Sequence, residues 1–284
     1  MKTATRREIE QALGAPAVEY GLARGGDIND AHALMLSDGR KVFVKTNPAS
    51  DRLSGLFAAE AAGLGALSGA ADELGVPRVI AWAESFLVLD WIDLGAKPDD
   101  FDERLGRGLA QMHRSSCREG YYGFERPTYL GRLRQENTPA DGPAAFWRDR
   151  RLVPLLDWLG AYPQVVRCGR TLAARLESVL DGPDEPATLV HGDLWSGNAG
   201  ADADGGVWIY DPACFYGCRE VEFGMTRLFG FGGRFEAAYQ EQWPLAEGWE
   251  RRVEVYRLHH LLSHLWHFGG DYEAQCLAAL DRLV

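Results

Sequence analysis

The stretch His191-Gly192-Asp193-Leu194-Trp195-Ser196-Gly197-Asn198 is the most informative part of this chain. A second stretch, Trp208-Ile209-Tyr210-Asp211-Pro212, follows it, and Asp211 lies thirteen residues beyond Asn198. Each acidic residue sits in a turn beside a short apolar run, residues 189–194 or 207–210, of the kind that forms short strands. We therefore expect the two stretches to fold together around one site.

The residue types in these stretches fit phosphoryl transfer from ATP. That reaction needs a carboxylate to orient the attacking hydroxyl and oxygen ligands to hold Mg²⁺ across the phosphates. Asp193 suits the first role, and Asn198 and Asp211 suit the second, because Mg²⁺ prefers hard oxygen donors. Either aspartate alone could equally be a helix cap or a turn residue.

A lysine and a glutamate nearer the N-terminus could complete such a site. Val42-Phe43-Val44-Lys45 alternates as a strand does, with Lys45 on the same face as Phe43. Glu60 lies fifteen residues further on, in an alanine-rich segment that reads as a helix. A Lys45–Glu60 pair would hold the ammonium group against ATP phosphates, although a strand lysine is more often a solvated edge charge.

Two further segments are candidates for binding the nucleotide. Gly25-Gly26 lies in the turn between the first two expected strands, where glycine lets backbone amides approach phosphates closely. A simple hairpin turn is the alternative. The expected strand 86–91 leads into a segment that would connect two lobes and offer backbone groups to adenine, and we place Asp90 and Ile92 there.

Along the chain, strands are expected first and helices later. Thr5 and Glu8 suggest a capping box before a short helix. The expected elements that follow are strands over 18–24, 32–36, 41–46, 78–83 and 86–91, helices over 58–67 and 101–115, a long ordered loop over 121–143, one or two helices within 146–180, and mostly helix from 219 with breaks at 230–233 and 269–270. This order predicts an α+β, bilobal protein, with a small β-rich nucleotide-binding lobe over 1–92 and a larger, mostly helical catalytic lobe over 93–284.

The composition excludes several classes of protein. Of 284 residues, 46% are hydrophobic and 25% are charged, as in an ordinary globular protein. The net charge of −11 disfavours a general nucleic-acid binder. No apolar run approaches the length of a membrane span, and the N-terminus lacks the apolar core of a secretory signal. The five scattered cysteines do not resemble a disulfide framework, so we expect a cytoplasmic protein without a membrane partner.

The chain resembles the fructosamine kinases, the fructosamine-3-kinase and ketosamine-3-kinase family, within the protein-kinase-like and aminoglycoside-phosphotransferase-like fold. The resemblance runs over essentially the whole chain. The parts of the sequence most specific to this family are Trp-Ser-Gly within the motif at 191–198 and the run IYDPACFYGCREVEF at 209–223. The lysine strand, the helix with Glu60 and the segment SHLWHFG at 263–269 support it.

This resemblance implies ATP-dependent phosphorylation of the 3-hydroxyl of a ketosamine, either a small molecule or a glycated lysine, as part of deglycation. It implies ATP and Mg²⁺ as cofactors, with Asp193 as the catalytic base. We expect Trp195, His264 and His267 to contact the substrate, although packing or capping roles are equally ordinary for them. The oligomeric state is left open by the sequence.

Two other functions remain open at this point. The same chemistry could serve another small hydroxyl acceptor, aminoglycoside-like or choline-like. Alternatively, the chain could bind a nucleotide without catalysing a reaction. The presence of every expected catalytic residue type argues against this last function.

Overall fold

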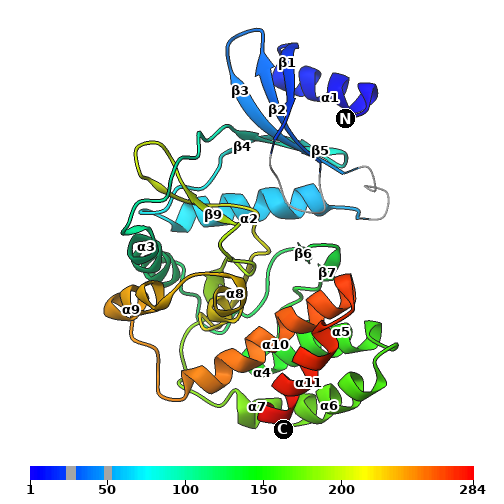
Figure 1. Cartoon of the computed structure of the whole chain (residues 1–284), viewed down its shortest axis with the longest axis vertical. Helices are drawn as coiled ribbons and strands as arrows, with labels where there is room; N and C mark the ends of the chain where they lie inside the picture. Colours follow the sequence, from blue (N-terminus) through cyan, green and yellow to red (C-terminus); the bar gives the residue numbers. More distant parts are fainter. Residues whose placement is uncertain (24–29, 48–52) are drawn as a thin grey trace.

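The computed structural model describes residues 1–23, 30–47 and 53–284. Its N-terminal part is an antiparallel sheet with the strand order β1-β2-β3-β5-β4, flanked by two helices (Figure 1). The elements of this part are α1 (Thr3–Leu13), β1 (Ala17–Leu22), β2 (Asp30–Leu36), β3 (Lys41–Thr46), α2 (Leu56–Ala70), β4 (Val79–Ala83) and β5 (Phe86–Asp90).

The strands agree closely with those expected from the sequence. In β2 and β3, Leu34 pairs with Val42 across the turn that contains Asp38 and Gly39. The capping box is wrong: α1 already begins at Thr3, so Thr5 lies inside the helix, and the N-cap residue Lys2 makes no side-chain cap.

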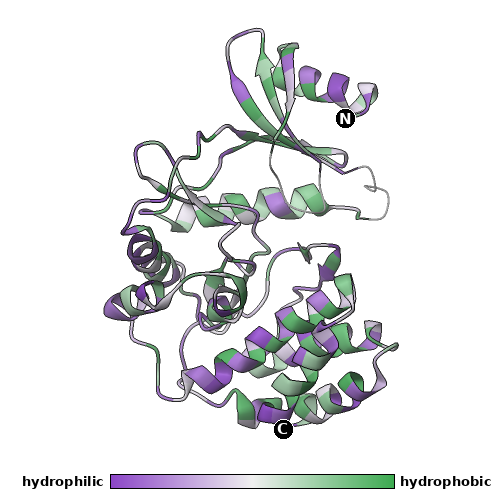
Figure 2. Cartoon of the chain, viewed as in Figure 1, coloured by the Kyte–Doolittle hydropathy of each residue, from purple (hydrophilic) through white to green (hydrophobic). Residues whose placement is uncertain are grey.

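Helix α2 lies under the sheet and is almost wholly hydrophobic (Figure 2). It packs with Leu87 and Leu89 of β5 through residues that include Phe57 and Leu64. Leu67, near its C-terminal end, belongs instead to the large core of the C-terminal part. Helix α2 is therefore packed into both parts of the molecule.

The C-terminal part is mostly helical, as expected. Its elements are α3 (Phe101–Ser115), β6 (Thr128–Leu130), β7 (Leu133–Gln135), α4 (Pro143–Trp147), the π-helix η2 (Arg148–Leu152), α5 (Val153–Trp158), α6 (Pro163–Ala174), α7 (Leu176–Val179), β8 (Thr188–Val190), β9 (Ala199–Ala201), β10 (Val207–Ile209), β11 (Phe215–Gly217), α8 (Val221–Phe229), α9 (Gly233–Gln242), α10 (Trp249–Phe268) and α11 (Tyr272–Leu283). The segment 121–143 is not a plain loop, since β6 and β7 form a short hairpin within it, and 146–180 contains more helical segments than expected.

Two short antiparallel ladders frame the stretch 191–198. Strand β8 pairs with β11, and β9 pairs with β10. The stretch 191–198 connects β8 to β9, and Asp211 lies in the connection from β10 to β11. The ladders therefore bring the two acidic stretches side by side, as their apolar flanks predict.

Among the described residues, no helix combines the length and the apolar character that crossing a membrane requires. All five cysteines are free thiols, and Cys214 and Cys276 are buried.

Candidate active site

A cavity of about 880 Å³ lies where the two parts of the molecule meet. It is lined by residues from β3 and α2, from the β6–β7 hairpin, from 191–198, from Asp211 and from α8, α10 and α11. Among the sequence candidates, the lining contains Lys45, Glu60, Asp193, Trp195, Asn198, Asp211, His264 and His267.

The loop 191–198, called the catalytic loop below, turns sharply at Gly192. This glycine has a φ of 80°, and a Cβ built on it would lie 2.5 Å from the carbonyl oxygen of Ala213. A side chain at this position would be strained and would clash with the backbone. Glycine therefore permits the turn that presents Asp193 to the cavity.

Asn198 fixes the side chain of Asp193. Its Nδ2 atom donates to the backbone carbonyl of Asp193 at 2.9 Å and to Asp193 Oδ2 at 3.3 Å. The other oxygen, Oδ1, is buried and has no hydrogen-bond partner among the described residues. Burial, with Asp211 and Glu222 as negative neighbours, raises the pKa of Asp193 well above its usual range. Asp193 thus keeps one free acceptor oxygen and an increased affinity for a proton.

Asp211 has a left-handed backbone with a φ of 62°, which is uncommon for a residue with a side chain. Its carbonyl oxygen lies 3.4 Å from Asn198 Nδ2, and its Oδ1 atom lies 2.8 Å from Lys45 Nζ. The side chain is 35% exposed, so its carboxylate remains open to the cavity. The asparagine and the aspartate therefore offer hard oxygen donors side by side, a set that fits Mg²⁺.

Lys45 of β3 and Glu60 of α2 form the expected ion pair. Lys45 Nζ lies 2.7 Å from Glu60 Oε1, and both side chains are only 6% exposed. Burial alone would lower the pKa of Lys45, but the charges of Asp211 and Glu60 outweigh it and raise that pKa. Burial raises the pKa of Glu60 to about 7, against the opposing effect of Lys45. The lysine is therefore a fixed cation facing the aspartates.

His191 supports the catalytic loop. Its Nδ1 atom accepts a hydrogen bond from the Asp193 N–H at 3.3 Å, and its Nε2 atom lies 3.0 Å from the Tyr210 carbonyl. Burial lowers the pKa of His191, so the ring is neutral and can accept at Nδ1 while it donates at Nε2. His191 therefore has a structural role in holding the catalytic loop.

Glu222 was missed by the sequence reasoning, although it lies in the run at 209–223. Its two carboxylate oxygens accept the N–H groups of His191 at 2.8 Å and Gly192 at 2.9 Å. Glu222 is only 1% exposed, and His113 Nε2 lies 3.8 Å from its Oε2 atom. Burial would raise the pKa of Glu222, but His113, His191 and the Gly192 N–H outweigh it and hold that pKa low. A buried carboxylate therefore anchors the backbone directly before Asp193.

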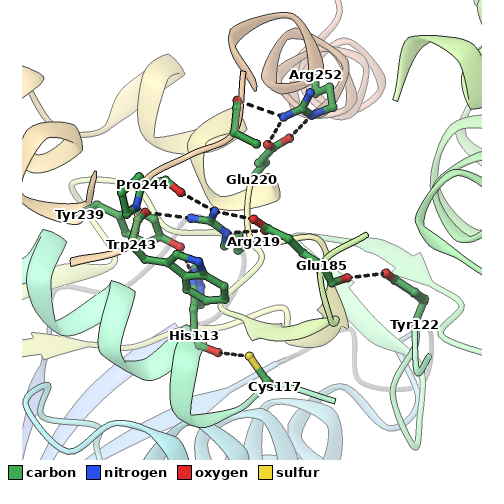
Figure 3. A network of polar contacts seen from close by, with 11 residues as sticks. His113, Cys117, Tyr122, Glu185, Arg219, Glu220, Tyr239, Trp243, Pro244 and Arg252 are labelled. Atoms are coloured by element: carbon green, nitrogen blue, oxygen red, sulfur yellow. Dashed lines mark hydrogen bonds and ion pairs between the residues drawn. The ribbon is translucent and has the colours of Figure 1, made fainter. Parts of the chain in front are cut away.

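Polar contacts also hold the residues directly before α8 and their neighbours (Figure 3). His113 Nδ1 lies 2.8 Å from the Tyr239 hydroxyl, and Arg219 donates to both carboxylate oxygens of Glu185 at 2.7 and 2.8 Å. Glu220, directly before α8, pairs with Arg252 at 2.6 Å. These pairs fix the start of α8, which carries Glu222.

The three substrate candidates all line the cavity, but they differ in their free groups. Trp195 is half-buried beside Asp193. His264 Nδ1 donates to the His260 carbonyl at 2.7 Å, which leaves Nε2 as an acceptor. His267 uses both nitrogens within the protein, through Ser263 and the backbone N–H of Arg132.

Two of the remaining nucleotide-binding candidates, Asp90 and Ile92, lie outside this cavity. Asp90 accepts a hydrogen bond from the Arg78 N–H at 2.7 Å, and neither Asp90 nor Ile92 lines this cavity. Gly25 and Gly26 lie outside the described residues.

Comparison with known proteins agrees with a kinase-type site. The model of a family described as fructosamine kinase matches residues 1–284. A rice relative, the chloroplastic protein-ribulosamine 3-kinase of Oryza sativa subsp. indica, is 34% identical over 266 residues, which cover 90% of this chain and 76% of the relative. A crystal structure assigned as a fructosamine-3-kinase from Thermobifida fusca has a TM-score of 0.89 and 31% identity, covering 100% of this chain and 99% of that one.

More distant structures bear on the fold alone. A structure of an amicoumacin kinase in complex with AMP-PNP, Ca²⁺ and Ami has a TM-score of 0.64 at 14% identity, and the match covers 98% of this chain and 92% of that one. The mixed architecture, with a five-stranded sheet followed by a helical part, is thus a kinase-like fold, as expected.

Proposed function

Because the chain belongs to the fructosamine kinase family, we propose that it transfers the γ-phosphate of ATP to the 3-hydroxyl of a ketosamine such as a fructosamine or a ribulosamine. The observation that carries this proposal is the convergence of Lys45, Glu60, Asp193, Asn198 and Asp211 on one cavity. Phosphoryl transfer needs these residue types in one place: a cation for the phosphates, a carboxylate that accepts a proton and oxygen ligands for a metal ion.

Asp193 is the proposed catalytic base. Its Oδ1 atom is buried and without a partner, so a substrate hydroxyl can supply the missing hydrogen bond. Its raised pKa favours acceptance of the hydroxyl proton as the phosphate is transferred. Asn198 Nδ2 and the anchored backbone of the catalytic loop hold this carboxylate in place.

Lys45 is the proposed contact for the ATP phosphates. Glu60 is buried in α2 and holds the ammonium group at 2.7 Å, so the cation is already oriented before the nucleotide arrives. Asp211 and the side-chain oxygen of Asn198 are the proposed ligands of Mg²⁺. A magnesium ion bound there would neutralise charge on the phosphate oxygens.

The charges of the cavity favour a ketosamine over a polycationic acceptor. Among the described lining residues, the carboxylates are Glu60, Asp193 and Asp211, all of them committed to the kinase machinery. The remaining wall carries aromatic rings and Arg132. An aminoglycoside would find no additional carboxylates there for its ammonium groups.

The test is ADP release by the purified protein with Mg·ATP. The acceptors are ribulosyl-lysine, fructosyl-lysine, an aminoglycoside and choline, and Asp193→Ala is the control. We expect turnover on a ketosamine that is lost in the variant. Turnover confined to the aminoglycoside or to choline would refute the ketosamine assignment, and ATP binding without turnover on any acceptor would favour a silent nucleotide-binding protein.

A further inference from the structure

The β6–β7 hairpin forms one wall of the cavity, and Arg132 lies at its tip. Leu130 pairs with Leu133, so Gly131 and Arg132 make up a two-residue turn. Gly131 has a φ of 62°, the left-handed conformation that such tight turns require. Both turn residues line the cavity.

The hairpin is fixed to both parts of the molecule. On one side, the Tyr129 hydroxyl donates to the Ser54 carbonyl, just before α2, at 2.7 Å. On the other side, the Arg132 N–H donates to His267 Nε2 of α10 at 3.0 Å. His267 Nδ1 donates to the Ser263 carbonyl at 2.8 Å, which leaves Nε2 as the acceptor. Burial lowers the pKa of His267 and keeps the ring in this neutral form. The backbone of Arg132 is therefore held at a defined place on the cavity wall.

The guanidinium group of Arg132 has no ion-pair or hydrogen-bond partner within the described parts of the chain, and its side chain is exposed. Arg134, on the same hairpin, differs because it pairs with Glu136. Arg132 is also the one cation among the described lining residues besides Lys45, which is already paired. An unpaired cation held by a fixed backbone is suited to receive an anionic group of a ligand.

A cluster of aromatic rings on the cavity wall adjoins the hairpin, since the ring of His267 lies 5.6 Å from that of Phe268. The ring of His264 lies 5.0 Å from that of Phe229, 5.7 Å from that of Phe268 and 5.2 Å from that of Tyr272, measured between centroids. Phe268 is 63% exposed although it lines the cavity. Such rings can face the ammonium group that a ketosamine carries, whereas Arg132 would repel it. The arginine would therefore interact favourably with a second, negatively charged group on the same acceptor.

We propose that Arg132 binds an anionic group of the acceptor, and that the enzyme prefers ketosamines with a carboxylate on the amine part or a phosphate on the sugar part. This inference rests on the proposed ketosamine kinase function. It adds the charge of the acceptor and the residue that selects it.

The experiment compares acceptors that differ in one charge. The first pair is the ketosamine of glycine and that of glycinamide, which differ by a carboxylate. The second pair is the ketosamine of methylamine with and without a phosphate on the terminal sugar hydroxyl. We expect the wild-type kcat/KM to favour the anion in at least one pair by about tenfold, the typical effect of one charge-assisted hydrogen bond. The pair that responds identifies the source of the charge.

The variants then assign this preference to Arg132. In Arg132→Gln, the ratio of kcat/KM within the responding pair should fall to near one. Arg134→Gln is the matched control and should keep the wild-type ratio, because Arg134 does not line the cavity. Thermal unfolding of both variants shows that the fold is retained.

Three results would overturn the inference. In the first, the wild-type enzyme turns over both members of each pair equally, which leaves the kinase function standing. In the second, Arg132→Gln lowers kcat/KM equally for charged and neutral acceptors and raises KM for ATP, so that the arginine serves the nucleotide. In the third, no ketosamine is turned over, and the proposed function fails as well.

Discussion

Replacing Glu222 with glutamine removes the charge that holds two backbone amides of the catalytic loop. The two carboxylate oxygens accept the N–H groups of His191 and Gly192 at 2.8 and 2.9 Å. In glutamine, one oxygen becomes an NH₂ group that faces an N–H donor. One charge-assisted hydrogen bond is lost, and a buried donor is left without a partner; each effect costs about 1–3 kcal/mol.

The two costs overlap, so we expect the free energy of unfolding to fall by about 2–4 kcal/mol. For a chain of this size, that corresponds to a decrease in Tm of about 3–7 °C. Because the anchored amides directly precede Asp193, kcat should also fall by about 10- to 100-fold. The effect on KM for ATP should be smaller, since Glu222 does not line the cavity.

The assay combines chemical denaturation with steady-state kinetics on a ketosamine acceptor. Glu241→Gln is the matched control, because Glu241 forms an exposed ion pair with Arg107 at 3.0 Å. Its unfolding free energy should change by less than about 1 kcal/mol. If Glu222→Gln unfolded like this control and kept the wild-type kcat, the carboxylate would not be the anchor of the loop.

Asp193→Asn should lower kcat by about 10²–10⁴-fold and retain ATP binding by calorimetry; turnover at the wild-type rate would remove its role as base. Asp211→Ala should weaken Mg·ATP binding and turnover together, and an unchanged Mg²⁺ titration would contradict its ligand role. Because the pKa of Asp193 is raised, activity should be present above that pKa and lost as pH falls through it, so a kcat/KM profile without any fall on the acid side would refute the base. Burial lowers the pKa of His260 to about 3. Below about pH 6.5 the unfolded chain alone takes up this proton, and stability should fall with pH by up to about 1.4 kcal/mol per unit; the slope should decrease in His260→Gln, and an identical slope would exclude His260 as a source.

Local patterns predicted the elements on which the site is built. The alternation at 42–45 correctly placed Lys45 on the face of Phe43, towards α2, where Phe43 packs against the cluster of Phe57 and Leu64. The helix over 101–115 was predicted to the residue. These segments are long and regular, so their periodicity is a strong signal.

What the sequence could not predict depends on contacts between distant segments. The hairpin at 128–135 has strands of three residues, too short for a visible alternation, and it is held by partners such as Ser54 and His267. Glu222 acts on residues about thirty positions away. The start of α1 is set without a side-chain cap, so the pattern of Thr5 and Glu8 was misleading.

Helix α2 links the two parts of the molecule, and this affects how the chain can unfold. Leu67 at its end and Leu74 just beyond it lie in the same core as Leu105 and Leu109 of α3, and Leu74 packs directly on Gly108. A fragment cut at the change from strands to helices, near residue 92, would expose these leucines to water. We therefore expect the sheet to unfold together with the helices below it, rather than as a separate unit that ends near residue 92.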